Sequence, residues 1–445
     1  MTYAEDIIQQ GLKEAKSRIA KNRRDETRKL LDYYTGTYTQ QYIDDYFKPD
    51  QFREIPFYNT NVTRKFINKM SRIYTVGASR NVSDQYNALT YKKDARFKHL
   101  ERMTRLLGSV AVQVTYNPYA TKPCFDYRPI YMFEVFLDDY NPFEPKAIIY
   151  PVQQNVADLS DTKQLEYVYW DSEVYCLHDA HGNIIEEFKH GYGRLPFVFL
   201  HKENQIDDFR VEGATDIVSC NEQVNITMTE LQLGLRFQMF GTPYVTGVYA
   251  DSKIERVGTD RILDLPEGAT FDIASPGGNI ESVIENVKFQ LELVALNNHM
   301  YVQFAQDGGE TPSGIALRIK DLEFMEDYED DKALWMLYEK DFYELEKIIG
   351  KANGINLPEE IGIDYNEVEY PQSVQDEISM NTYFLENNLT TQAKLLKKYN
   401  DDLTIEEAQA IVDENKEING ATNGKNEEPK QSIFGAARDR VANTQ

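Results

Sequence analysis

Apolar residues follow a helical spacing in some parts of the chain and a strand-like spacing in others, and this pattern predicts the order of the elements. The first thirty-odd residues carry a helical apolar stripe that stops at Gly36, and further helices are predicted over 61–74 and 89–107. Residues 108–200 instead hold short runs rich in Val, Ile, Tyr and Phe, separated by turn residues. These runs predict a mostly antiparallel β unit.

The helical spacing returns at about residue 213, and two helices are predicted over 213–240 and 279–305. Between them, 241–278 reads as a compact β segment with Gly and Pro at its turns. The stripes of the two helices are formed by Ile217, Val224, Met228, Leu231, Leu235 and Met239, and by Ile280, Val283, Ile284, Val287, Leu291, Val294 and Val302. Two interpretations stay open: packing within one chain, or packing against identical helices of neighbouring subunits.

A glycine-containing loop at 306–312 precedes a long helix predicted from Ser313 to about Ile349. Six acidic residues within 323–331 predict a kink or an exposed middle in this helix. Beyond Gly354 we expect a short strand, then helices over 374–387, 391–399 and 404–416, and a flexible polar tail over 418–445. The predicted fold class is therefore α+β.

Composition narrows the class of protein. The 445 residues carry a formal net charge of −25, which argues against tight binding to phosphates. This charge is compatible with a conduit wall along which DNA slides, and equally with simple solubility or a salt-adapted host. One local exception is the first helix, whose basic cluster is a candidate contact for DNA or an acidic protein surface: Lys13, Lys16, Arg18, Lys21, Arg23, Arg24, Arg28 and Lys29. Neither a membrane span of ~20 apolar residues nor a signal peptide is recognisable, so we expect a cytoplasmic, soluble product.

Candidate chemistry is sparse. No GxxxxGK[ST] loop is present, so an ATP-driven motor is not expected. The run from His178 to Asn183 reads as a surface turn between strands before it reads as a metal site. Cys124, Cys176 and Cys220 lie far apart and are expected to be buried thiols. No cofactor is expected, and acid pairs are too frequent in this chain to single out a catalytic pair.

The order of elements, together with several short stretches, resembles the portal proteins of tailed bacteriophages, particularly those of siphophage type. The stretches are LLDYYTGTY after the first helix, LLGSVAVQVTYNP and YRPIYMFEVFLDD in the β unit, YGRLPFVFLHKENQIDDF before residue 213, and TPSGIALRIKDLEF at the start of the long helix. Each stretch is weak alone, and their order over roughly residues 5–417 is the stronger signal.

The resemblance implies a portal fold with an α/β wing, two stem helices, a small β-containing clip, a long kinked helix and a small helical crown. Its segments would be the wing (1–212), first stem helix (213–240), clip (241–278), second stem helix (279–305), tunnel loop (306–312), long helix with return to the wing (313–373), crown (374–417) and tail (418–445). Site residues are implied in three groups. Those of the tunnel loop facing the DNA channel would be Gln306, Asp307, Gly308, Gly309, Glu310, Thr311 and Pro312. Those packing stem helices between subunits would be Val224, Met228, Leu231, Leu235, Ile284, Val287, Leu291 and Val294, and those of the clip Tyr244, Tyr249, Arg256, Arg261 and Phe271.

By the same resemblance, the chain is expected to be a non-enzymatic virion protein. It would form a ring of twelve subunits at one capsid vertex, assembled in the host cytoplasm, as the channel for DNA packaging and ejection. Double-stranded DNA would pass through it without sequence specificity. Its protein partners would be the terminase large subunit, head–tail connector proteins, and the major capsid and scaffolding proteins, with no membrane. Two other classes stay open: another minor capsid or connector protein of the phage head, and a metal-dependent enzyme acting on nucleic acid.

Overall fold

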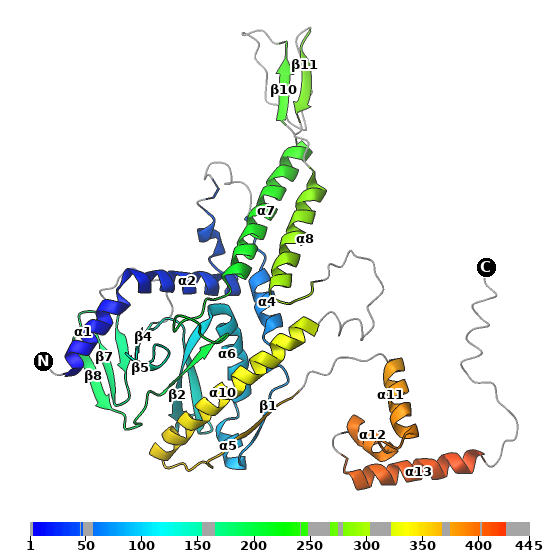
Figure 1. Cartoon of the computed structure of the whole chain (residues 1–445). Helices are drawn as coiled ribbons and strands as arrows, with labels where there is room; N and C mark the ends of the chain where they lie inside the picture. The colour runs from blue at the N-terminus through cyan, green and yellow to red at the C-terminus, as the bar shows by residue number, and fades with distance from the viewer. Residues whose placement is uncertain are drawn as a thin grey trace, which may run out of the picture. The chain divides into compact units, whose positions relative to one another are not determined.

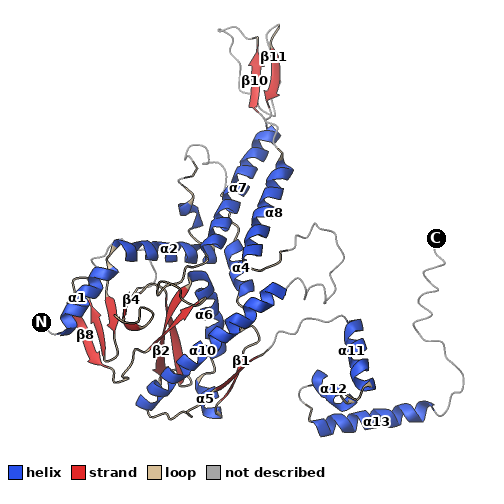
Figure 2. Ribbon diagram, viewed as in Figure 1, coloured by secondary structure: helices blue, strands red, loops and turns tan. Residues whose placement is uncertain are grey.

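The computed structural model describes residues 3–44, 46–47, 57–153, 165–240, 242–247, 268–274, 279–302, 322–366, 374–400 and 403–423. It is mixed α+β, as the sequence predicts (Figures 1 and 2). The chain divides into two compact units, which are described separately. The first comprises Met1–Glu310 and Arg318–Val368, and the second comprises Thr311–Leu317 and Glu369–Gln445.

The first predicted helix is two helices, α1 (Tyr3–Ala15) and α2 (Arg18–Thr35). The chain breaks at Ser17 because its side-chain oxygen accepts a hydrogen bond from the backbone N–H of Ala20 at 3.1 Å and so caps α2. Gly36 ends α2 as predicted, in the left-handed conformation with φ of 76°. A short 3-10 turn, η1 (Thr39–Tyr42), follows.

The next two predicted helices are shorter than expected. Helix α4 (Val62–Met70) ends before residue 74, and the segment predicted as 89–107 contains α6 (Lys93–Leu107), which is preceded by α5 (Asp84–Leu89). A separate helix forms here because both of its ends are capped. Ser83 caps the start of α5, and at its end the hydroxyl of Thr90 donates a hydrogen bond to the carbonyl of Tyr86 at 2.9 Å.

The predicted antiparallel β unit forms two sheets, and every strand pair in them is antiparallel. The three-stranded sheet has the order β3-β2-β9, and the five-stranded sheet has the order β4-β5-β6-β7-β8. The strands are β2 (Ser109–Asn117), β3 (Cys124–Ile130), β4 (Glu134–Leu137), β5 (Pro145–Pro151), β6 (Tyr167–Trp170), β7 (Val174–His178), β8 (Ile184–Lys189) and β9 (Phe197–His201).

Three apolar clusters hold these layers together. The largest lies between the three-stranded sheet and the helices α6 and α10 (Leu322–Ala352), where the rings of Phe97 and Phe342 are 4.7 Å apart between centroids. A second cluster packs Ile8 and Leu12 of α1 onto one face of the five-stranded sheet. The third joins the two sheets and contains Trp170. The body of the first unit is thus built from two sheets with helices on their outer sides.

The helices and strands from residue 215 to residue 365 follow the predicted order. Helix α7 (Thr215–Phe240) is followed by β10 (Thr242–Thr246) and β11 (Thr270–Ala274), which pair antiparallel, and by α8 (Ile280–Asn297). The long helix α10 runs without a break through the acidic stretch, and the expected strand is β12 (Gly362–Tyr365), which pairs with β1 (Ala78–Asn81).

The prediction that the second of these helices extends to about residue 305 is wrong, because α8 ends at Asn297. His299 adopts a left-handed conformation with φ of 51°, and the N–H of Met300 returns to the carbonyl of Ala295 at 2.8 Å. This backbone reversal satisfies the last carbonyls of the helix and turns the chain away from its axis.

The second unit contains the three predicted helices, α11 (Val374–Glu386), α12 (Gln392–Tyr399) and α13 (Ile405–Asn423). Thr404 begins α13 with a reciprocal cap, in which Glu407 accepts from its backbone N–H and hydroxyl. Helix α13 continues into the segment predicted to be a flexible tail, so that boundary was placed too early. Residues 424–445 lie outside the described residues.

Candidate functional site

The most distinctive feature of the first unit is the helical arm, formed by α7 and α8. Figure 1 shows the two helices side by side, extending away from the sheets, with the β10–β11 hairpin beyond their far ends. Helix α7 has 26 residues and therefore spans about 39 Å. The arm, its root on the body and its tip form the candidate site.

The root of α7 is a row of polar side chains spaced four residues apart on one face. Asn221 accepts hydrogen bonds at its Oδ1 atom from the backbone N–H groups of Val62 and Thr63, at 2.7 and 2.9 Å. Asn225 accepts from the N–H of Thr60 at 2.9 Å, and Thr229 accepts from the N–H of Tyr58 at 3.1 Å. All three acceptors are buried: Asn221, Asn225 and Thr229. The row thus gives acceptors to the backbone N–H groups of the segment that leads into α4 and of the first residues of α4.

An ion pair adds a second contact at this root. Lys29 of α2 lies 2.8 Å from Glu222 of α7, and its ammonium group also stands over the rings of Tyr33 and Tyr42 at 5.9 and 5.7 Å. Burial, with a smaller effect from Glu222, raises the pKa of Tyr33 above its usual value, so this phenol stays neutral. Helix α2 therefore braces the base of α7.

Within the arm, α7 and α8 pack on each other along the predicted apolar stripes. Val224 and Val287 are buried in one cluster with Cys220, and Met228, Leu291 and Val294 pack against it. Nearer the tip, Leu231 and Leu235 line a groove of about 490 Å³ between the two helices, and Ile284 is exposed. Five of the eight residues predicted to pack stem helices thus make contacts inside one chain.

A second stripe, which the sequence analysis missed, lies on the outer face of α8. Phe289, Leu293 and Leu296 are spaced i, i+4, i+7 and are 61%, 46% and 64% exposed. Large apolar side chains gathered on a helix surface mark an interaction site more often than isolated ones do. The i, i+4, i+7 spacing of these residues is visible in the sequence. Apolar residues occupy more than one face of this helix, however, so their periodicity alone did not single out this stripe.

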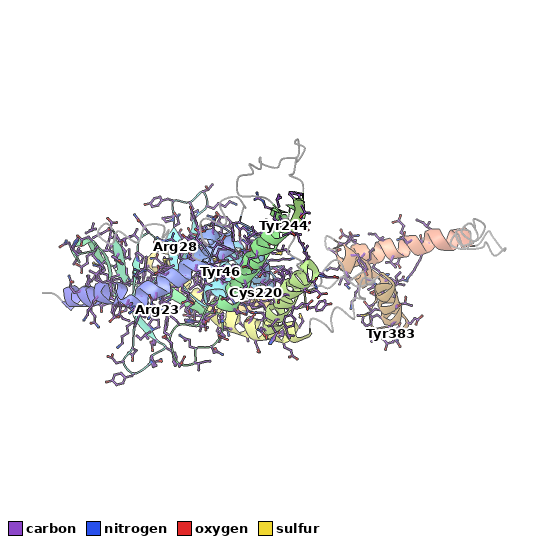
Figure 3. All side chains as sticks on the ribbon, turned by 90° about the horizontal axis from the view of Figure 1, so that it is seen from above. Arg23, Arg28, Tyr46, Cys220, Tyr244 and Tyr383 are labelled. Atoms are coloured by element: carbon purple, nitrogen blue, oxygen red, sulfur yellow. The ribbon has the colours of Figure 1, made fainter. Side chains whose placement is uncertain are left out.

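The hairpin at the tip is joined by cross-strand polar pairs. Tyr244 donates to Asp272 at 3.2 Å, and the hydroxyls of Thr246 and Thr270 lie 2.6 Å apart. Phe271 of the predicted clip set is opposite Val245. Figure 3 labels Tyr244 in the view along the arm. The other members of that set lie outside the described residues: Tyr249, Arg256 and Arg261.

The predicted tunnel loop, Gln306 to Pro312, also lies outside the described residues, but the structure describes the two elements that flank it. His299, just after α8, holds its Nδ1 atom 2.7 Å from Asp327 of α10. Lys69 of α4 donates to the carbonyl of Tyr301 at 2.8 Å. Arg105 of α6 forms an ion pair with Asp331. The acidic stretch of α10 therefore contacts basic groups of the body.

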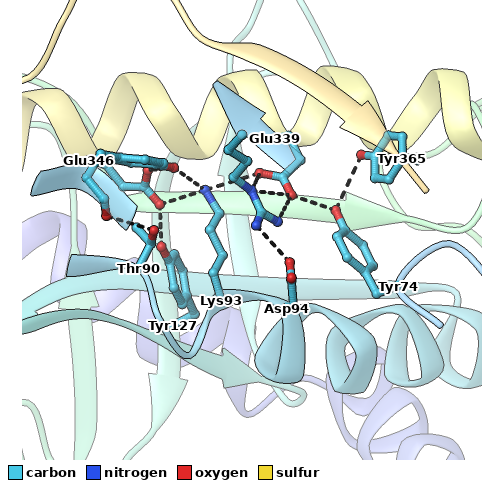
Figure 4. A network of polar contacts seen from close by, with 10 residues as sticks. Tyr74, Thr90, Lys93, Asp94, Tyr127, Glu339, Glu346 and Tyr365 are labelled. Carbon is cyan, nitrogen blue, oxygen red and sulfur yellow. Dashed lines mark hydrogen bonds and ion pairs between the residues drawn. The ribbon is translucent and has the colours of Figure 1, made fainter. Parts of the chain in front are cut away.

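A buried ionic network fastens the second half of α10 to the body (Figure 4). Lys93, fully buried on α6, lies 3.1 Å from Glu339 and 2.8 Å from Glu346. Arg80 of β1 pairs with Glu339 and, at 2.7 Å, with Asp94. Tyrosine hydroxyls complete the set, donated by Tyr74 to Glu339 and by Tyr86 and Tyr127 to Glu346.

The two cations of this network face three carboxylates, of which Glu339 and Glu346 are buried and Asp94 is 45% exposed. Burial acts to raise the pKa of Glu339, but Lys93 and Arg80 outweigh it, so the pKa is lowered and the carboxylate stays ionised. Burial also raises the pKa of Glu101, to about 7, against hydrogen bonds from the N–H groups of Ile73 and Tyr74. The network is enclosed by core residues, so its role is to position α10.

The remaining sequence candidates behave as structural groups. The predicted turn forms, because the carboxylate of Asp179 accepts from the N–H groups of His181 and Asn183, and His181 is exposed. His178, however, ends β7 and is buried, with its ring stacked on that of Tyr167 at 6.0 Å between centroids. The three cysteines are free and buried, as predicted: Cys124, Cys176 and Cys220. In the described part of the chain, no group of three His, Cys, Asp or Glu side chains is placed to hold a metal ion. No helix among the described residues is long and apolar enough to cross a membrane.

The basic cluster of the first helices is largely engaged inside the chain. Arg23 pairs with Glu134 and Arg28 with Asp32, and Figure 3 shows both arginines along α2. Lys16 donates to the carbonyl of Ala180, and Arg24 donates to that of Ala15. Only Lys13, Arg18 and Lys21 are exposed without a side-chain contact among the described residues.

Comparison with known proteins adds no relative: the chain matches no protein-family model and no curated protein sequence.

Proposed function

We propose that this chain is the portal protein of a tailed bacteriophage. The observation that carries the proposal is the helical arm: two antiparallel helices that project from an α+β body and are joined by a small β-hairpin at their tip. With the quoted sequence stretches, this order of elements is the one that the portal resemblance implies. In that assignment the body is the wing, the arm is the stem, the hairpin belongs to the clip, and α11–α13 form the crown.

A ring of identical subunits would supply a cover for the apolar surface that the arm exposes in one chain. The stripe of Phe289, Leu293 and Leu296 has no cover among the described residues, and a helix pair on its own cannot bury both of its faces. Arms arranged side by side around an axis would cover each stripe with the next subunit. Residues of the groove near the tip, such as Leu231 and Val283, would meet the same neighbour. The number of subunits, twelve, follows from the resemblance alone.

The proposed role is structural. The ring would sit at one capsid vertex and let double-stranded DNA pass during packaging and ejection without reading its sequence. The clip would meet the terminase large subunit and later the head–tail connector proteins, and the wing would meet capsid and scaffolding proteins. The net charge of −25 fits a channel along which DNA slides, because an acidic wall does not hold phosphates tightly.

The decisive test is negative-stain electron microscopy of the purified full-length protein, with class averages along the symmetry axis. Rings with a central hole and roughly twelve-fold symmetry are the expected result. A compact dimer without a channel, or a protein that stays monomeric even when co-expressed with the scaffolding and capsid proteins of its phage, would refute the proposal.

A further inference from the structure

The solvent-facing side of α6 is basic along its whole length, in a chain that is strongly acidic overall. Five side chains form this α6 basic face: Lys92, Arg96, Lys98, His99 and Arg102. Each of them is exposed or half-buried. The opposite side of the helix is buried in the main core through Phe97, Leu100 and Met103. The face therefore follows from the helical period, which leaves these positions to solvent.

Carboxylates do not neutralise this face from within the helix. Asp94 points to Arg80 at 2.7 Å, and Glu101 is buried under the loop that carries Ile73 and Tyr74. The nearest acid from another element is Asp126 of β3, 3.9 Å from Arg96 in a pair that is half exposed. Such an exposed pair contributes little to stability and leaves Arg96 available to a stronger anion.

Arg102 adds an observation of a different kind. Its Nε atom is buried, yet it has no hydrogen-bond partner among the described residues. Eight other buried side-chain atoms of the described residues share this state, so the case for the face rests on its exposed cations. Beside Arg102, the ring of His99 lies 2.9 Å from the hydroxyl of Tyr131, and burial, with Arg96 and Arg102 nearby, lowers the pKa of His99. At neutral pH the face thus carries four positive charges.

The α6 basic face differs in this respect from the basic cluster of α1 and α2. Most cations of that cluster are bound by partners in the same chain, such as Glu134 and Glu222. The cations of the α6 basic face, unlike the paired Lys93 and Arg105 of the same helix, have weaker partners or none among the described residues. Of the two basic regions, α6 is therefore the one whose charge can act on another molecule.

We infer that the α6 basic face binds the phosphate backbone of double-stranded DNA. From Lys92 to Arg102 the face extends about 15 Å, at 1.5 Å per residue. One strand of B-DNA presents a phosphate about every 3.4 Å along the duplex axis, so about four phosphates fit along this length. The Debye length at physiological salt is about 8 Å, so distant acidic residues do not cancel the local field.

The choice of DNA as the polyanion rests on the proposed function, whereas the anion-binding character of the face does not. An acidic surface of a second copy of this chain is the alternative ligand, because it is negatively charged as DNA is. DNA is favoured because its regularly spaced phosphates can meet cations spread along the length of the helix, and because DNA is the polymer the proposed ring surrounds. Under this inference, DNA touches the body of the subunit in addition to passing along the arm.

The test measures binding of a fluorescent 20-base-pair duplex of random sequence to the full-length protein by anisotropy, between 50 and 200 mM salt. The test variant is Arg96→Gln/Lys98→Gln/Arg102→Gln. The matched control is Lys13→Gln/Arg18→Gln/Lys21→Gln, which removes the same charge from exposed positions on α1 and α2. A third variant, Arg96→Lys/Arg102→Lys, keeps the charge of the face.

For four phosphate contacts, the wild-type affinity should fall on the order of 100-fold over this salt range. We expect the test variant to bind at least about 10-fold more weakly at 50 mM salt, with a shallower salt dependence, because three contacts are lost. The control and the charge-preserving variant should stay within about 2-fold of wild type. Equal weakening by the test and control variants, or no binding by the wild type, would overturn the inference.

Microscopy and sedimentation of the same variants separate this inference from the proposed function. Rings that form normally while DNA binding is lost only in the test variant support both. Rings with DNA binding unchanged in the test variant overturn the α6 assignment alone. If the test variant instead fails to assemble and binds DNA as well as wild type, the face serves a second copy, and the inference is wrong.

Discussion

Asn221, the first residue of the polar row on α7, accepts hydrogen bonds from both the backbone N–H and the hydroxyl of Thr63, the second residue of α4. The same amide oxygen accepts from Val62, and its nitrogen donates to the carbonyl of Thr60. One side chain therefore caps the start of α4 and fixes the base of the arm. Its loss affects both elements at once.

We predict that Asn221→Ala lowers the free energy of unfolding by at least about 2 kcal/mol, because it leaves buried N–H groups without an acceptor. Chemical denaturation measures the change. The control is Asn286→Ala on the exposed side of α8, for which we expect less than about 0.5 kcal/mol. Equal effects of the two variants would mean that the polar row does not anchor the arm.

Replacing Lys93 tests the buried network. Lys93→Met leaves Glu339 and Glu346 buried with one cation fewer, and we expect a loss of about 3–5 kcal/mol in the free energy of unfolding. Glu339 keeps its ion pair with Arg80, so adding Glu346→Gln removes the carboxylate charge that has lost its cation and should restore part of the loss, as measured by a double-mutant cycle. Lys146→Met, at a side chain that is 52% exposed, should cost less than about 1 kcal/mol.

Acid should destabilise the body through His201. Burial lowers the pKa of this residue from 6.5 to about 4, so the folded state favours the neutral ring. The stabilisation is complete above pH 6.5 and is lost as the pH falls from there towards 4, by roughly 3 kcal/mol. His178, whose pKa is also lowered by burial, acts in the same direction.

The measurement is the free energy of unfolding as a function of pH between 8 and 4. We expect the profile of a His201→Gln variant to be flatter than that of wild type over this range. The exposed His181, replaced by Gln, serves as the control and should leave the profile unchanged. A His201→Gln profile as steep as that of wild type would show that the acid effect has another source.

The outer stripe of α8 predicts the surface that assembly covers. Phe289→Gln/Leu293→Gln/Leu296→Gln should abolish ring formation without loss of folding, because these side chains are already exposed in the single chain. Mass photometry gives the distribution of assemblies, and circular dichroism checks the fold. Tyr119→Gln/Tyr140→Gln/Ile206→Gln, at exposed positions away from the arm, should assemble as wild type does. Rings formed by the stripe variant would place the subunit interface elsewhere.

The order of helices and strands could be predicted from the sequence because hydrophobic periodicity is a local signal. Helix ends were less predictable. The break at Ser17 and the reversal at His299 depend on single caps, and polar residues interrupt a helical pattern without ending it at many other sites. For the acidic stretch of α10 a kink or an exposed middle was expected. The helix continues without a kink, and the second alternative holds because Glu326, Glu329 and Asp330 are exposed.

Contacts between distant residues could not be read from the sequence at all. Lys93 and Glu346 are 253 positions apart, and nothing near either residue distinguishes a buried ion pair from an exposed charge. Asn221, Asn225 and Thr229 show the same difficulty, because polar residues at four-residue spacing are typical of a solvated helix face. Two predicted groups, the tunnel loop and most of the clip residues, stay predictions because they lie outside the described residues.

The polar row on α7 also sets how accurately the far end of the arm can be aimed. The part of α7 beyond Asn225 spans about 22 Å and acts as a lever, so a rotation of about 5° at the row moves the end of the helix by about 2 Å. Apolar contacts tolerate small rotations, whereas hydrogen bonds with fixed directions do not. Because the polar row holds α7 by directional hydrogen bonds, the orientation of α7 is fixed, and with it the position of the β10–β11 hairpin at its end.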